Sequence, residues 1–198
     1  MTEAEFVELV TLGEARGVEL KGPLSLRDKA AVRVIRAALA LANRRDGGYI
    51  VVGVSESKGR SPEYTGLDEA QTKSWAYDDI ADQLELYAAP RIRVSVEEVS
   101  FDSKRFVVIR VAEFEEMPIL CKKQTAETTA GACYVYPLGK AETRPIPAEE
   151  DMRDLLDRAT ERQLRRLLAR VGRAGGRIVA SGEKNPYEDS MREFFDGD

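Results

Sequence analysis

The chain has 198 residues, of which 43% are hydrophobic, and a net charge of −5. This length suits one globular core with an appendage. No stretch approaches the ~18 consecutive apolar residues of a membrane span, and the acidic first residues lack the basic flank of a signal peptide. We therefore expect a cytoplasmic protein with no membrane partner.

The residue types restrict the chemistry. The chain has no histidine and two cysteines, so Ser-His, Cys-His and His-ligated metal mechanisms are excluded. Cys121 and Cys133 are expected to be core residues, and no zinc, haem or nucleotide cofactor is expected. The remaining groups for acid–base catalysis are carboxylates, lysines and tyrosines. If the protein hydrolyses a substrate, its carboxylates are expected to bind a hard cation through their oxygens.

In the first quarter of the chain we predict a short helix over Thr2–Val10 and a strand over Val18–Lys21. Ser25 followed by Asp28 resembles a capping box that opens a helix ending near Asn43. Residues 49–54 do not alternate, which indicates a central strand buried on both faces. Residues 55–68 contain glycines and a proline and predict a loop.

The middle of the chain predicts a helix over Ser74–Ala88 anchored by Trp75, then an antiparallel hairpin from Arg91 to Val111. Short strands are expected over Pro118–Cys121 and Ala132–Tyr136, joined by a mobile, solvated connection. Four basic residues on these elements are candidates for contacts with a nucleic-acid backbone. They are Arg91, Arg93, Lys122 and Lys123.

The last part of the chain predicts a helix from Ala148 to Val171. Its apolar stripe lies beyond the length of helix that a domain of this size can bury, which suggests a homodimer through this helix. The stripe consists of Leu164, Leu167, Leu168 and Val171. Residues 160–181 are expected to hold the end of the helix and a glycine-rich joint, and residues 182–198 an acidic flexible tail.

Positive charge is concentrated on the same segment. Seven arginines against one acid between Arg158 and Arg177 give a local charge of +6 and leave −11 elsewhere. This asymmetry fits either a surface that binds a polyanion or a solvated helix whose arginines pair with neighbouring acids. The nucleic-acid-binding candidates there are Arg162, Arg165, Arg166 and Arg170.

Two segments bring acids towards one edge of the predicted sheet. Glu14 and Glu19 belong to Glu-Ala-Arg-Gly-Val-Glu-Leu-Lys, and Glu56 follows Gly47-Gly48-Tyr-Ile-Val-Val-Gly-Val. Buried strands that deliver acids to a common edge are typical of a site. An exposed strand with Glu19 and Lys21 on its wet face fits the first segment equally well.

These motifs, with Ala40 to Asn43 and the later Gly66-Leu67, resemble the Schlafen-type AlbA-like domain over roughly Leu12–Ala159. The resemblance implies an α+β fold, a mixed β-sheet with flanking helices, to which this chain adds a long C-terminal helix. Two departures are a third residue between Asn43 and Gly47, and Ser55-Glu56 where the family commonly has two acids.

The resemblance also implies chemistry. Schlafen-type nucleases use three carboxylates, and Glu14, Glu19 and Glu56 occupy those positions. They would hold Mg²⁺ or Mn²⁺, and Lys21 would steady the developing oxyanion. Glu56 is one methylene longer than an Asp at this position, so the third metal ligand would be longer.

Two functions remain open at this stage. The first is a metal-dependent endoribonuclease acting on structured RNA such as tRNA, and the second is a non-catalytic DNA- or RNA-binding module. No Gly-x-x-x-x-Gly-Lys-Ser/Thr loop is present, so no NTPase activity is expected.

Overall fold

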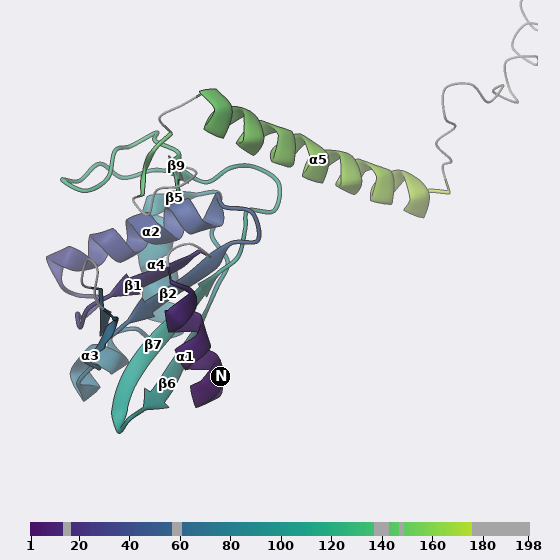
Figure 1. Ribbon diagram of the computed structural model, residues 1–198. Coiled ribbons are helices and arrows are strands. Elements are labelled where there is room, and N and C mark those ends of the chain that lie inside the picture. The colour runs from purple at the N-terminus through teal and green to yellow at the C-terminus, as the bar shows by residue number, and fades with distance from the viewer. Residues whose placement is uncertain (14–16, 57–60, 137–142, 147–148, 176–198) are drawn as a thin grey trace, which may run out of the picture. The chain divides into compact units, whose positions relative to one another are not determined.

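The computed structural model describes residues 1–13, 17–56, 61–136, 143–146 and 149–175. The chain divides into two compact units, Met1–Ala159 and Thr160–Asp198. Figure 1 shows the secondary structure of the chain in ribbon form. Within the described ranges, no helix is both long enough and apolar enough to cross a membrane.

The first unit is built on a four-stranded sheet. The strands lie in the order β1 (Val18–Lys21), β2 (Gly48–Val52), β7 (Lys104–Val111) and β6 (Val94–Phe101). β1 runs parallel to β2, whereas β2–β7 and β7–β6 are antiparallel. The predicted α+β fold with a mixed sheet and the predicted hairpin are therefore confirmed.

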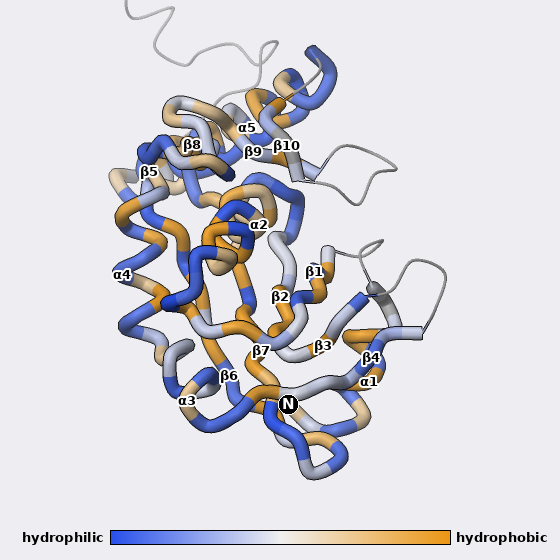
Figure 2. The backbone as a smooth tube through the Cα atoms, turned by 90° about the vertical axis from the view of Figure 1, so that its left-hand side faces the viewer, coloured by the Kyte–Doolittle hydropathy of each residue, from blue (hydrophilic) through white to orange (hydrophobic). Residues whose placement is uncertain are grey.

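Helices cover both faces of this sheet, which explains why its central strands are apolar throughout. Ile50, Val52 and Ile109 belong to the core that includes α2 (Val32–Ala42) and α4 (Tyr77–Tyr87). Val51 and Val108 belong to a second core with α1 (Glu3–Leu12). Figure 2 shows the apolar residues of β2 and β7 between these layers.

Three two-stranded ladders complete the described strands. β3 (Val54–Ser55) pairs with β4 (Glu63–Tyr64), so the predicted loop over residues 55–68 contains a short strand. β5 (Ala88–Ala89) pairs with β8 (Leu120–Cys121), and β9 (Tyr134–Val135) pairs with β10 (Arg144–Pro145). The two predicted strands near the cysteines exist but are shorter than expected.

The connection between those strands is largely exposed, as expected, but it is also bonded to the domain. Thr128 is buried, and its hydroxyl donates to the carbonyl of Lys123 at 2.9 Å. Glu127 forms ion pairs with Arg33 and Arg36 on α2. The partners of Glu127 lie more than 90 positions earlier in the chain, so local composition did not reveal these ion pairs.

The helix expected to begin at Ser25 begins later. Asp28 does accept a hydrogen bond from the backbone N–H of Ser25, but this closes a turn that leads into η2 (Lys29–Ala31) and then α2. Two distant groups hold the preceding backbone out of a helix. Trp75 Nε1 donates to the carbonyl of Leu24, and Leu26 N–H donates to Ser74 Oγ.

The same region contains a helix that the sequence analysis missed. α3 (Glu69–Lys73) is opened by a capping box in which Asp68 and Gln71 exchange hydrogen bonds. Its five residues are too few to show a helical period. Trp75 follows it, 1% exposed, and anchors the segment as predicted.

The predicted C-terminal helix is present as α5 (Glu149–Arg173). Its first half is held by Arg158, whose side chain is buried. The Arg158 guanidinium donates to Glu113 at 2.7 Å, to the carbonyl of Asn43 at 2.7 Å and to Asp154 at 2.9 Å. Arg158 was counted in the basic segment, and its burial removes it from any polyanion-binding surface.

The Arg158 contacts lead to a stability prediction. Arg158→Leu removes the buried cation that pairs with Glu113, and breaking a buried pair in this way costs about 3–5 kcal/mol. We expect a corresponding loss in the free energy of unfolding, measured in urea by the fluorescence of the buried Trp75. Arg153→Leu is the matched control on the same helix, because its pair with Glu149 is exposed and should change stability by at most about 0.5 kcal/mol. Equal effects would contradict the role given to Arg158.

Candidate nucleic-acid interface

Glu19 lies in the middle of the edge strand β1, opposite Ile50. Its neighbours Val18 and Leu20 pack into the core with α1, so the alternation of a strand directs Glu19 to the face covered by α2. Its side chain is buried, with the residue 7% exposed. The interpretation of Glu19 as a residue on a wet face is therefore wrong.

The Glu19 carboxylate has a partner on each oxygen. Oε1 accepts a hydrogen bond from the ammonium of Lys21 in an ion pair. Oε2 accepts a hydrogen bond of 2.8 Å from the hydroxyl of Tyr136. Removing a carboxylate from water is costly unless charged and polar partners replace the water. This cluster of Glu19, Lys21 and Tyr136, the edge cluster, supplies both.

Tyr136 was missed as a site residue because it lies 117 positions from Glu19. The side chain of Asn43 holds its segment in place by donating to the carbonyls of Tyr134 and Ile119. No local pattern in residues 132–136 signals a polar contact. The pairing of Asn43 with this segment helps to bring the hydroxyl to the edge strand.

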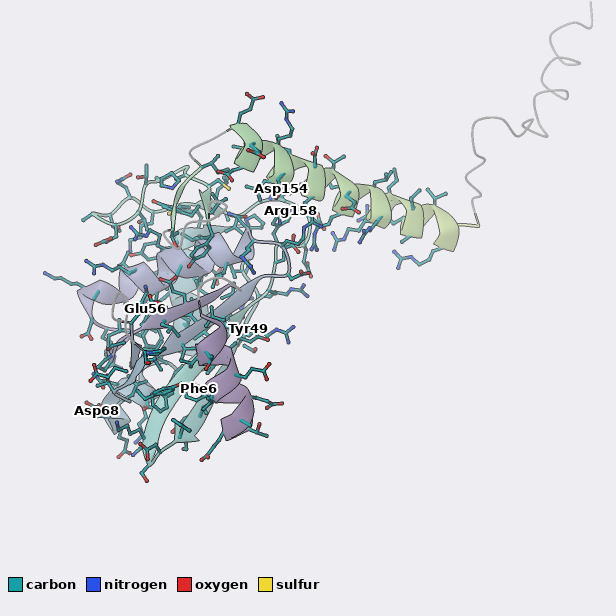
Figure 3. The ribbon with its side chains drawn as sticks, in the orientation of Figure 1. Phe6, Tyr49, Glu56, Asp68, Asp154 and Arg158 are labelled. Atoms are coloured by element: carbon teal, nitrogen blue, oxygen red, sulfur yellow. The ribbon has the colours of Figure 1, made fainter. Side chains whose placement is uncertain are left out.

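The other two predicted site acids are Glu56 and Glu14. Glu56 directly follows β3 and is exposed (Figure 3). Its segment meets the end of β1, because Gly53 N–H donates to the carbonyl of Lys21 at 2.8 Å. Glu14 lies outside the described residues. Among the residues that are described, no three acidic or cysteine side chains gather in a way that could hold a metal ion.

The glycine pair that opens β2 has a packing reason. A Cβ on Gly47 would lie 2.1 Å from the carbonyl oxygen of Val111, and one on Gly48 would lie 2.3 Å from that of Gly17. Gly47 also has a φ of +71°, a region that favours glycine. The pair therefore allows close approach of backbones at the N-terminal end of β2.

A cleft of about 520 Å³ lies beside the edge cluster and is lined by Tyr136. Arg44 and Arg45, from the turn after α2, line it together with the acids Asp151 and Asp154 of α5. Arg45 pairs with Asp154 at 3.8 Å. Charges of both signs thus share the cleft.

Three of the four basic candidates on the first unit lie close to acidic side chains or over an aromatic ring. Arg91 and Arg93 line a groove of about 340 Å³ with three glutamates, and Arg93 pairs with Glu115 at 2.8 Å. Lys122 is exposed, and Lys123 lies 4.7 Å above the ring of Tyr87. This surface carries no excess of positive charge around the two arginines.

The basic candidates on α5 lie in a segment that contains few acids. Residues 160–173 carry five arginines and one glutamate. Helical spacing puts Arg162, Arg166 and Arg173 on the side opposite the leucines, while Arg165 and Arg170 flank them. Arg165 pairs with Glu161 at 2.6 Å. We call Arg162, Arg166 and Arg173 the arginine stripe.

The cysteines take no part in a reactive site. Cys121 and Cys133 are both buried, as predicted, and burial raises the pKa of the Cys133 thiol to about 11. Asn43 Nδ2 donates to the Cys133 sulfur at 3.3 Å. Thiolates are the reactive form of cysteine, so Cys133 is inert at neutral pH.

The chain is similar in sequence and in structure to known proteins. The model of the family described as Schlafen, AlbA_2 matches residues 14–136. No curated protein matches the chain, while five chains of solved structures do.

Two of these structures illustrate the likeness. The N-terminal domain of a RecG-related protein from Nitrosomonas europaea is 23% identical, with a TM-score of 0.49 over 74% of this chain and 94% of that one. The DIP2311 protein from Corynebacterium diphtheriae is 17% identical, with a TM-score of 0.48 over 72% of this chain and 26% of that protein. The present chain thus spans about a quarter of the second relative.

The family match covers more than half of the chain and includes β1, α2, the glycine pair and the later strands. The chain therefore belongs to the Schlafen AlbA_2 family, a family of nucleic-acid-binding domains.

Proposed function

We propose that the second half of α5 binds the phosphate backbone of DNA or RNA through the arginine stripe. The observation that carries this proposal is the concentration of five arginines against one acid on a stretch of 14 helical residues in a chain whose net charge is −5. Arginine forms bidentate hydrogen bonds with phosphate, and a row along one helix side follows a nucleic-acid backbone. Arg91, Arg93, Lys122 and Lys123 are secondary candidates, because acids share the groove of the two arginines.

The salt dependence of binding tests this proposal. Each phosphate contact contributes about 0.7–0.9 to the slope of log affinity against log salt. Arg162→Ala with Arg166→Ala should therefore flatten the slope by up to about two units, measured by fluorescence anisotropy with labelled RNA and duplex DNA.

The matched control for this experiment is Lys73→Ala with Arg153→Ala, which removes the same charge from exposed positions elsewhere. It should leave the slope unchanged. A slope that flattens equally in both double variants would show that only net charge matters. A slope that neither variant changes would move the interface to the secondary candidates.

As a second candidate function we propose metal-dependent cleavage of structured RNA such as tRNA. It is supported by the edge cluster, where a buried carboxylate, an ammonium and a phenol meet on the edge strand β1. Carboxylate oxygens suit Mg²⁺ or Mn²⁺, and Glu19 and Glu56 would hold the ion with Glu14. The bound ion would supply an activated water and neutralise charge on the scissile phosphate. Lys21 would stabilise negative charge that develops on the phosphate oxygens.

Glu19→Gln separates cleavage from binding. The amide keeps the size of the side chain and can still accept from Tyr136, but it loses the charge that the ion requires. We expect cutting of tRNA in Mn²⁺ to be abolished, with affinity preserved, and the exposed Glu85→Gln to cut normally. Undiminished cutting by Glu19→Gln, or cutting that survives a chelator, would reject this role. Binding without cutting by the wild-type protein would favour the non-catalytic alternative.

We also propose a homodimer in which the leucine seam of α5, Leu164, Leu167, Leu168 and Val171, packs against a second copy. The three leucines are 41–56% exposed, and Val171 is half-buried. A row of exposed leucines is more often an interface than a solvated surface. Burial would contribute about 1.5–3 kcal/mol for each side chain before the costs of association.

Leu167→Asp places a charge in the middle of the seam and should convert the dimer to a monomer with weakened nucleic-acid binding. Light scattering at tens of micromolar measures the first effect and anisotropy the second. Ala169→Asp, an exposed position on the side of the helix opposite the seam, should remain dimeric. A wild-type protein that is monomeric under these conditions would reject the dimer.

A further inference from the structure

All the charged residues of α4 are acidic. Its eleven residues include four acids, Asp78, Asp79, Asp82 and Glu85, and no lysine or arginine. A surface of this kind repels a nucleic-acid backbone. It therefore lies outside the proposed phosphate interface and needs a different explanation.

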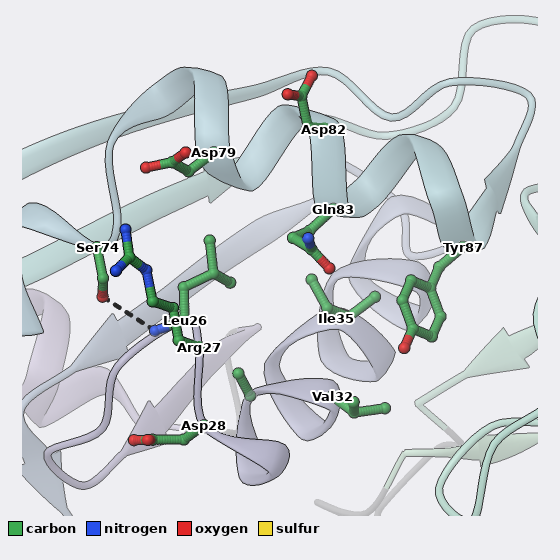
Figure 4. A pocket seen from close by; sticks show the side chains of 11 residues that line it. Leu26, Arg27, Asp28, Val32, Ile35, Ser74, Asp79, Asp82, Gln83 and Tyr87 are labelled. Atoms are coloured by element: carbon green, nitrogen blue, oxygen red, sulfur yellow. Dashed lines mark hydrogen bonds between the residues drawn. The ribbon is translucent and has the colours of Figure 1, made fainter.

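A groove of about 360 Å³ runs along this helix, between α4 and the segment that leads into α2. Figure 4 shows its lining, with Asp79 and Asp82 on α4 and the aliphatic side chains of Leu26, Val32 and Ile35 across from them. Leu26 and Val32 are only half-buried, so apolar surface is accessible there. Both acids are exposed. The groove thus combines an apolar floor with an acidic wall, to which Arg27 and Asp28 add one charge of each sign.

The chain itself carries a segment with the complementary features. Residues 160–173 have a net charge of +4, against −4 on α4. The leucine seam offers apolar side chains, and Arg165 and Arg170 flank it on either side. A helix that lays such a seam into a groove places its flanking cations against the walls.

We infer that the groove along α4 is the docking site for the leucine seam of a second copy of this chain, with Arg165 and Arg170 of that copy facing Asp79 and Asp82. In a twofold arrangement each chain contributes one seam and one groove, so the contact is made twice. The arginine stripe lies opposite the seam and stays outside the contact. Docking of the seam therefore does not cover the arginine stripe.

This inference rests on the proposed homodimer and is independent of nucleic-acid binding. It also differs from a symmetric contact of seam against seam. In that arrangement the acids of α4 play no part, which makes the two arrangements separable by experiment.

The test is a charge exchange between two variants. Asp79→Arg/Asp82→Arg and Arg165→Asp/Arg170→Asp each place like charges across the contact, so each alone should be monomeric by light scattering at tens of micromolar. In an equimolar mixture, one contact has both sets of charges reversed and the other has the wild-type pairs. The mixture should therefore form a heterodimer, weakened by salt.

Asp78→Arg/Glu85→Arg is the matched control. It makes the same charge change on the same helix at two exposed positions that do not line the groove. Each pair includes one first-turn acid, so the effect on the helix dipole is equal. This control should remain dimeric, and circular dichroism should show every variant folded.

The outcomes separate the proposals. A monomeric wild-type protein overturns both the homodimer and the groove. A dimeric Asp79→Arg/Asp82→Arg protein, or a mixture that stays monomeric, overturns the groove alone. Loss of the dimer in the Asp78→Arg/Glu85→Arg control would also overturn it, because net charge rather than the groove would then control association. Nucleic-acid affinity enters none of these readouts.

Discussion

The first unit depends on Asn43, a buried polar residue at the end of α2. Its side chain exchanges hydrogen bonds with the backbone of Ile119 and donates to the carbonyl of Tyr134. Its own carbonyl accepts from Arg158. One residue thus joins α2, the two short segments around the cysteines and the first half of α5. A buried network of this kind specifies one arrangement, because leaving any member without a partner costs about 1–3 kcal/mol.

The edge cluster follows from this arrangement. β1 is the outer strand of the sheet, so a polar side chain on it is expected to reach water. The segment held by Asn43 instead brings Tyr136 over Glu19 and buries the carboxylate. A carboxylate that keeps its charge in such a place requires nearby donors, and Lys21 and Tyr136 supply them.

α5 combines two roles in one continuous helix. In its first half Arg158 is turned inward and neutralised by Glu113 and Asp154. In its second half the arginines carry most of the positive charge of the region, and the leucines are exposed. The same residue type therefore stabilises the domain at one end and forms the proposed phosphate-binding surface at the other. Burial, rather than residue type, separates the two roles.

The sequence by itself determined the elements whose signal is local. The unbroken apolar run of β2, the alternation in the β6–β7 hairpin, the glycine pair and the helical period of α5 were all readable, because each is a pattern in residues that are close in the sequence. The family resemblance rested on the same residues. Only the tertiary structure decided where α2 begins, that Glu127 pairs with α2, that Arg158 is internal and that Tyr136 meets Glu19. Each of these depends on a hydrogen bond or ion pair between residues far apart in the chain, and such contacts leave no period in the sequence around either partner.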